Sequence, residues 1–282
     1  MTDQASELPL GVTVKKVSHN SGSLSRLIRS TAFRRAIVLI GLAVIWQIGA
    51  VWFAKPLLLP SFTQTAAAFW DALLHEDLAR SATASLGVLL KGYALAIAIG
   101  LVLVSVASAN AFLREALLTL TAMFNPLPAI ALLPLAMLWF GLGETSLIFV
   151  LVHSVLWPFA LATFSGFQSV PETHRLVGRN YGLTGARYVA LILIPSASPS
   201  IISGLKIGWA FAWRTLIAAE LVFGVSASKG GLGWFIFRNR NELFTDKVFA
   251  GLATVIIIGL VVEFGLFRVL EAATVRRWGM QR

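Results

Sequence analysis

Residues 171–195 read Pro171-Glu-Thr-His-Arg-Leu-Val-Gly178-Arg-Asn-Tyr-Gly182-Leu-Thr-Gly-Ala-Arg-Tyr-Val-Ala-Leu-Ile-Leu-Ile194-Pro195, and they separate two apolar runs of membrane length. Helices are usually joined by 2–8 residues, roughly, whereas this segment is much longer, polar and basic. Its spacing is compatible with a helix that glycines interrupt, and it carries Arg175, Arg179 and Arg187. The pattern predicts a helical segment outside the bilayer that offers one face to another molecule.

The composition places most of the chain in lipid. Of 282 residues, 57% are hydrophobic and 13% are charged, and the mean hydropathy is +0.80. A soluble domain of this size cannot bury so much apolar surface, so we expect an integral membrane protein. The net charge of +10 does not indicate nucleic-acid binding, because Lys and Arg gather beside apolar spans and no soluble basic domain remains. The absence of cysteine excludes disulfides and thiolate metal sites.

Six apolar segments are long enough to cross a bilayer, which takes about 20 helical residues. They cover 36–54, 84–109, 112–141, 145–167, 196–225 and 248–270. With the N-terminus inside, the cytoplasmic segments hold 14 Lys and Arg residues and the opposite segments hold 6. This bias predicts an all-α membrane protein of six transmembrane helices with both ends in the cytoplasm. Cytoplasmic tails are expected over 1–35 and 276–282, around a transmembrane domain over 36–275.

Prolines interrupt the third apolar segment. Asn125-Pro126-Leu-Pro128 and Pro134 fall inside it, and Gly141-Leu-Gly143 closes it. Proline removes a backbone donor and clashes with the preceding turn. In lipid, the carbonyl groups that it frees need protein or water as partners. The pattern favours a kinked helix, which serves either packing or the lining of a cavity.

Charged residues inside the spans are candidates for a solute path, because charge at that depth is costly and faces a bundle interior, a pore or a partner. Arg214 and Glu220 lie deepest, and their spacing does not place them on one helix face as an i,i+4 pair. A structural ion pair and a role in a path both remain open for them. We expect His153 to be a satisfied core residue and Trp157 to settle near a membrane interface. The chain shows no phosphate loop, paired carboxylates or metal-ligand cluster.

Four motifs, in order and spacing, resemble those of a known family. The stretch Gly178-Arg-Asn-Tyr-Gly182-Leu-Thr-Gly with the later Ile194-Pro195 resembles the EAA loop of ABC-importer permeases. Three others resemble the permeases of nitrate, sulfonate and taurine importers: Asn125-Pro-Leu-Pro with Leu133-Pro-Leu-Ala-Met-Leu-Trp139-Phe-Gly-Leu-Gly143-Glu-Thr, Ala212-Trp-Arg-Thr-Leu-Ile-Ala-Ala-Glu220, and Gly230-Gly-Leu-Gly233. The likeness covers residues 40–275. One departure is that Leu176-Val177-Gly178 stand where the family motif has its acidic residue, and Glu172 lies one turn earlier.

The resemblance implies the fold and the partners of a type I importer permease. It implies a homodimer with two cytoplasmic ATPase subunits, which bind ATP and magnesium, and with a periplasmic or lipid-anchored substrate-binding protein. The chain itself is expected to bind no cofactor, to catalyse no reaction and to reside in the bacterial inner membrane. Its solute is expected to be a small anion of the nitrate, sulfonate or taurine type, which the permease moves by alternating access.

The resemblance also assigns a coupling helix, at about 171–187, that docks on the ATPase. The expected docking residues are Glu172, Arg175, Leu176, Gly178, Arg179, Tyr181, Gly182, Leu183, Thr184 and Arg187. Apolar side chains would anchor this interface and the arginines would form its polar rim. Gly182 is expected to allow a close approach or a left-handed turn. The translocation path is expected to be lined by Pro128, Pro134, Met137, Trp139, Trp213, Arg214 and Glu220.

Other function classes make different predictions. The segment 171–195 has an alternative as an amphipathic helix that lies on anionic lipid. A self-sufficient secondary transporter or channel is commonly built from internal repeats, and the sequence shows none. A membrane-embedded enzyme needs a cluster of nucleophiles or metal ligands, for which the sequence offers only His75, Glu76 and Asp77.

Overall fold

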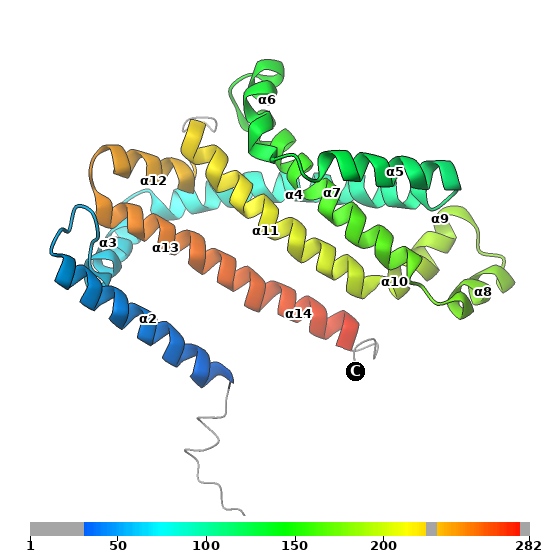
Figure 1. Ribbon diagram of the computed structural model, residues 1–282, viewed down its shortest axis with the longest axis horizontal. Coiled ribbons are helices and arrows are strands. Elements are labelled where there is room, and N and C mark those ends of the chain that lie inside the picture. Colours follow the sequence, from blue (N-terminus) through cyan, green and yellow to red (C-terminus); the bar gives the residue numbers. More distant parts are fainter. Residues whose placement is uncertain (1–30, 224–229, 277–282) are drawn as a thin grey trace, which may run out of the picture.

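The computed structural model describes residues 31–223 and 230–276, and these residues form helices joined by short turns (Figure 1). The long helices are α2 (Thr31–Phe53), α4 (Leu78–Ala107), α7 (Glu144–Gln168), α11 (Ser198–Phe223) and α13 (Thr245–Val261). The short ones are α3 (Phe62–His75), α5 (Ala111–Phe124), α6 (Leu133–Phe140), α8 (Glu172–Asn180), α9 (Gly185–Tyr188), α10 (Ile194–Ser196), α12 (Leu232–Asn241) and α14 (Arg268–Glu271). The expected tails, 1–35 and 276–282, lie outside the described residues except for 31–35 and 276.

Four of the described helical runs are long and apolar enough to cross a membrane: α2, α4, α7 and the run Thr245–Thr274 that begins with α13. Two bent pairs, α5 with the run 129–140 and the run 185–196 with α11, bring the number to six if each pair is one span. Each of the six apolar segments of the sequence is therefore helical. The all-α membrane fold is confirmed.

The break in the third apolar segment is sharper than a kink. The chain bends by 87° between α5 and the run that ends with α6. Pro126 and Pro128 carry no amide hydrogen to continue the backbone bonds of α5, which ends at Phe124, and the backbone of Pro128 is extended. The chain re-enters helical structure through one short turn, Ala129–Leu132, and α6 ends at Gly141, whose φ is +77°. Consequently α6 folds back against the start of α7, and the two project beyond α5 (Figure 1).

The core lies around α7, which packs between α4 and α11. Its side chains Leu151, Val155 and Phe159 are almost fully buried, together with Leu89 of α4 and Leu216 of α11. By contrast, α2 lies at the edge of the molecule and exposes apolar side chains along its length. A helix that is apolar and exposed suits contact with lipid. The three central helices therefore share one core, on which the candidate sites are built.

Candidate functional site

A left-handed turn ends α8, the first helix of the predicted coupling segment. Gly182 has a φ of +67°, and its amide donates to the carbonyl oxygen of Arg179 at 2.9 Å. The amide of Leu183 donates to the carbonyl oxygen of Gly178 at 3.0 Å. This pair of bonds is the Schellman motif, in which glycine adopts the left-handed conformation at little cost. The left-handed turn predicted for Gly182 is present, and nothing lies within 4 Å of where its Cβ would stand.

The close approach in this segment occurs at Gly178 rather than at Gly182. Gly178 is buried, and a Cβ on it would stand 2.9 Å from Ile192 Cγ1 and 2.9 Å from Tyr188 Cε2. Real Cβ atoms do not approach other heavy atoms so closely, so a larger residue must push the two elements apart. The glycine therefore sets how tightly α8 packs on the residues that lead to α11.

The outer face of α8 and the turn after it expose apolar side chains among charged ones. Leu176 and Val177 are 47% and 49% exposed, and Tyr181 in the following turn is 81% exposed. Of the other predicted docking residues, Glu172, Arg179, Thr184 and Arg187 are exposed and Leu183 is half-buried. Large exposed apolar side chains beside positive charge are a mark of a protein interface. The glycines shape the segment, and these side chains present its surface.

Arg175 differs from the other arginines of the segment because it points inward. Its Nη2 donates to the carbonyl oxygen of Phe167 at 2.6 Å, and its Nε donates to that of Val170 at 3.2 Å. These carbonyl groups lie at and just beyond the C-terminal end of α7, where a positive charge is favourable. Arg175 thus ties α8 to the central helix of the fold.

The coupling segment continues into α11 without a flexible linker. After α9, a π-helical turn (Val189–Leu193) and α10 lead to a bend of 80° at the start of α11. Leu193 and Ala197 are buried against Phe164 and Phe167 of α7. Packed residues therefore connect α8 to α11 and α7.

Glu220 lies in a buried cluster that joins three helices, which we call the Glu220 cluster (Ser85, Glu220, Leu232 and Gly233). Ser85 of α4 donates its hydroxyl to the Glu220 carboxylate of α11, with both oxygens at 2.8 Å. The amide of Gly233 donates to Glu220 Oε2, and that of Leu232 donates to Ser85 Oγ, each at 2.8 Å. Leu232 and Gly233 begin α12, so the carboxylate lies at a helix N-terminus, which favours it. The cluster fixes the end of α11 to α4 and α12.

The motif Gly230-Gly-Leu-Gly233 packs so closely on Glu220 and α11 that two of its positions leave no room for a side chain. A Cβ on Gly231 would overlap the Glu220 carboxylate, and a Cβ on Gly233 would stand 2.8 Å from the carbonyl oxygen of Ile217. Two of the four sequence motifs, the one ending at Glu220 and Gly230-Gly-Leu-Gly233, thus form a single contact. Glu220 does not pair with Arg214, so the ion pair left open by the sequence is not formed here.

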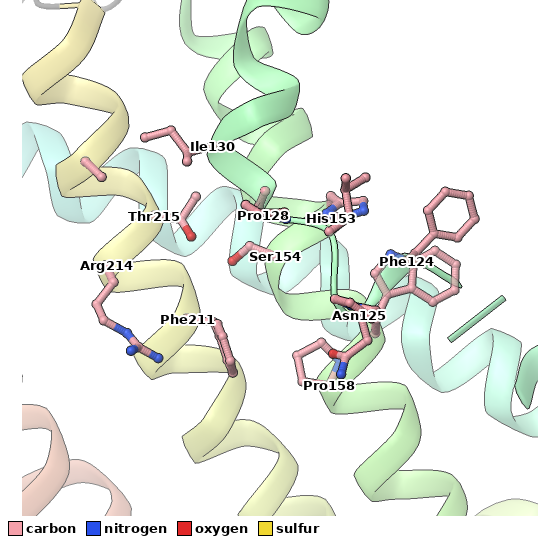
Figure 2. A pocket seen from close by; sticks show the side chains of 15 residues that line it. Phe124, Asn125, Pro128, Ile130, His153, Ser154, Pro158, Phe211, Arg214 and Thr215 are labelled. Atoms are coloured by element: carbon pink, nitrogen blue, oxygen red, sulfur yellow. The ribbon is translucent and has the colours of Figure 1, made fainter. Parts of the chain in front are cut away.

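A cavity of about 350 Å³ lies between the Asn125–Pro128 break, α7 and α11 (Figure 2). Its polar side chains come from all three walls: Asn125 from the break, His153, Ser154 and Trp157 from α7, and Arg214 and Thr215 from α11. In Figure 2, Ser154 and Thr215 point into the space between α7 and α11, and Arg214 lies beside the ring of Phe211. The guanidinium carbon is 4.9 Å from that ring's centroid.

The residues predicted to line the path do not all gather at this cavity. Pro128 and Arg214 line it. Trp213 is buried on the other side of α11 and donates to the carbonyl oxygen of Val255 at 3.2 Å. In α6, Pro134 and Trp139 are exposed and Met137 packs against the core. Together with Glu220 in its cluster, these residues occupy four separate places in the chain's structure.

Several cavity residues were missed or misread from the sequence. His153 was expected to be satisfied, yet neither ring nitrogen has a hydrogen-bond partner. Trp157 was expected near an interface, yet it is buried in mid-α7 and stacks on Phe124, with ring centroids 5.0 Å apart. Ser154 and Pro158 were not singled out. The available signal was their spacing, because positions i, i+1, i+4 and i+5 form one stripe on a helix that is otherwise apolar.

The three polar residues considered for a membrane-embedded enzyme are used in ion pairs. His75 lies 3.1 Å from Asp71, Glu76 pairs with Lys247, and Asp77 lies 3.9 Å from both Arg80 and Arg238. The His75–Asp71 contact lies within α3, whereas Glu76 and Asp77, in the turn after α3, connect to α13 and α12. They hold together the end of the molecule at which the Glu220 cluster also lies.

Comparisons with a family model and with individual proteins point to the same family. The family described as "Binding-protein-dependent transport system inner membrane component" matches residues 92–274. The taurine transport system permease protein TauC of Escherichia coli is 32% identical over 238 residues, which are 80% of this chain and 82% of TauC. The nitrate import permease protein NrtB of Synechocystis is 29% identical over 85% of this chain and 88% of its own length. The putative aliphatic sulfonates permease SsuC of Escherichia coli is 27% identical over 78% and 82%.

This family match extends over the cavity, the coupling segment and, except for Ser85, the Glu220 cluster. It agrees with the resemblance drawn from the four motifs. It favours a permease subunit over the two alternatives, a secondary transporter and a membrane-embedded enzyme. In this family the ATPase is a separate subunit, so the chain is not itself an enzyme. The chain belongs to the binding-protein-dependent ABC-importer permeases and is related to those of the taurine, nitrate and sulfonate systems.

Proposed function

We propose that two copies of this chain form the membrane path of an importer for a small anion of the nitrate, sulfonate or taurine type. Two cytoplasmic ATPase subunits, which bind ATP and magnesium, would act on the pair from the inside. A periplasmic or lipid-anchored binding protein would deliver the solute from the outside. The chain would lie in the bacterial inner membrane with both termini in the cytoplasm, as the distribution of Lys and Arg favours.

The observation that carries this proposal is the construction of α8. It combines an exposed face of apolar and charged side chains with a tight contact at Gly178 on the residues that lead to α11. A helix that rested only on lipid would need the exposed face but not the tight contact. In the proposed cycle, closure of the ATPase pair displaces α8 and thereby moves α11 against α7. The path opens outward when ATP binds and returns inward after hydrolysis.

Two single-cysteine variants test the orientation and the docking. The chain has no cysteine, so Tyr181→Cys and Leu57→Cys each supply its only thiol, at residues that are 81% and 69% exposed. A membrane-impermeant maleimide should label Tyr181→Cys only from the cytoplasmic side and Leu57→Cys only from the opposite side. Assembly with the ATPase should protect Tyr181→Cys and leave Leu57→Cys reactive. If the ATPase does not change the labelling of Tyr181→Cys, the coupling assignment is wrong.

The homodimer and the solute class need separate measurements. Co-purification of two differently tagged copies of the chain tests the dimer directly. Uptake of nitrate, ethanesulfonate and taurine into proteoliposomes that hold the complete complex tests the solute class. An importer that takes up none of the three with its own binding protein is not an anion importer of this type.

A further inference from the structure

We propose that the cavity between the Asn125–Pro128 break, α7 and α11 is an oxyanion site within the permease itself. In it, Arg214 and the α7 polar cluster (His153, Ser154 and Trp157) bind the nitrate or sulfonate group as the solute passes. This inference rests on the proposed function, because it assumes that the solute is a small anion. It adds that the permease, and not only the binding protein, selects for that group.

Arg214 differs from Lys91 and Lys206, two lysines that also lie within the membrane spans. Lys91 lies 2.6 Å from a carboxylate oxygen of Glu144, and Lys206 pairs with Glu271. No ion pair found in 31–223 and 230–276 includes Arg214; its Nε donates to the carbonyl oxygen of Ala210, one turn earlier in α11, at 3.1 Å. The nearest buried carboxylate in α11, that of Glu220, is engaged with Ser85 and Gly233. A charge in a membrane span without a counter-ion is expected to serve a solute or a partner.

The α7 polar cluster supplies hydrogen-bond donors that have no partner. Both ring nitrogens of His153, the hydroxyl of Ser154 and the indole nitrogen of Trp157 have no hydrogen-bond partner and are buried at the cavity wall in this conformation, so a solute would reach them once α11 moves away from α7. Buried polar groups are nearly always hydrogen-bonded, so an unbonded set of three side chains requires an explanation. All three residue types can donate, and Trp can only donate. Donors without acceptors match the oxygens of a nitrate or sulfonate group.

The shape and charge of the cavity fit the same ligand. Its volume of about 350 Å³ corresponds to roughly ten water molecules of about 30 Å³ each, which is enough for a hydrated sulfonate. None of the described residues that line it is Asp or Glu. Arg214 lies on α11 and the α7 polar cluster on α7, so movement of one helix against the other brings the two halves of the site together or separates them. Such a site binds in one conformation and releases in the other.

A thiol inside the cavity tests the proposal by binding rather than by transport. Thr215→Cys places the only thiol of the chain on the cavity wall, beside Arg214. In the assembled complex, nitrate or ethanesulfonate should slow its labelling by a neutral maleimide, whereas gluconate at equal ionic strength should not. Adding Arg214→Gln should weaken this protection about tenfold or more in anion concentration, the effect of losing one charge-assisted hydrogen bond. Arg214→Lys should retain part of it.

The matched control is Arg35→Gln, because Arg35 also stacks on a phenylalanine, at 4.6 Å from the ring of Phe264, but lies outside the cavity. It should leave the protection unchanged. Absence of protection by either anion, in a complex that takes up one of them, overturns this inference and leaves the proposed function standing. Absence of any anion uptake overturns both. If Arg214→Gln fails to assemble, loss of protection in His153→Ala or Ser154→Ala decides the question, and unchanged protection in both refutes it.

Discussion

Ser85→Ala is expected to destabilise the folded permease by about 2.5–6 kcal/mol, a large effect for the removal of one oxygen atom. Ser85 is fully buried, and its hydroxyl both accepts from the amide of Leu232 and donates to Glu220, at 2.8 Å each. Removal leaves a buried amide without a partner, which costs about 1–3 kcal/mol, and deletes a hydrogen bond to a carboxylate worth about 1.5–3 kcal/mol. The two losses add because they concern different partners of the same oxygen.

Thermal unfolding of the purified complex, followed by tryptophan fluorescence, measures this effect. For a chain of this length, 1 kcal/mol corresponds to roughly 2–4 °C, so the Tm should fall by on the order of 10 °C. Ser105→Ala is the matched control, because Ser105 is on the same helix and donates to the carbonyl oxygen of Leu101, one turn earlier, at 2.6 Å. That bond lies within one helix, so its loss should change the Tm little. Equal shifts in the two variants would refute the Glu220 cluster as a specific contact.

Two further predictions concern the coupling segment. Gly178→Val should abolish the stimulation of the ATPase by the loaded binding protein, because the valine side chain displaces α8 from Tyr188 and Ile192. Gly182→Ala should retain most of this stimulation, because its Cβ meets open space and the backbone strain is only about 1–2 kcal/mol. A larger loss of stimulation in Gly182→Ala than in Gly178→Val would contradict the packing described for Gly178. Arg175→Ala should lower the free energy of unfolding by about 2 kcal/mol, because it removes two hydrogen bonds to the carbonyl groups of Phe167 and Val170. Arg187→Ala, at an exposed position, should leave the Tm unchanged. Equal Tm values for the two variants would show that Arg175 does not tie α8 to α7.

Local sequence patterns predicted the elements well, for clear physical reasons. Apolar runs longer than about 20 residues must be helical in lipid, since only a helix satisfies its backbone within one segment. The prolines of Asn125-Pro-Leu-Pro predicted a disturbed helix, and the chain bends there by 87°. The left-handed turn at Gly182 followed from the freedom of glycine at positive φ. In each case the determining interaction lies within a few residues along the chain.

What could not be predicted depends on contacts between distant residues. Ser85 and Glu220 are 135 positions apart, and nothing near Ser85 indicates that it bonds a carboxylate. For the same reason Glu220 was assigned to the path, although the structure buries it at the start of α12. Gly178 was grouped with the docking residues, and its packing against Tyr188 and Ile192 became clear only from the turn that brings them together. Sequence periodicity indicates which face of a helix carries the polar residues, but not which residues of other helices pack against that face.

The Glu220 cluster and the coupling segment together restrict how α11 can move. The cluster holds one end of α11 to α4 and α12, and in the proposed cycle the coupling segment would drive the other end, near Ser198. Sliding of α11 along its axis would break the buried bonds of Glu220, so a pivot about Glu220 is the less costly motion. With a rise of about 1.5 Å per residue, Arg214 is about 9 Å from this pivot and Ser198 about 33 Å. Arg214 therefore moves about a quarter as far as the driven end, so a large stroke at the ATPase becomes a small, controlled change at the cavity.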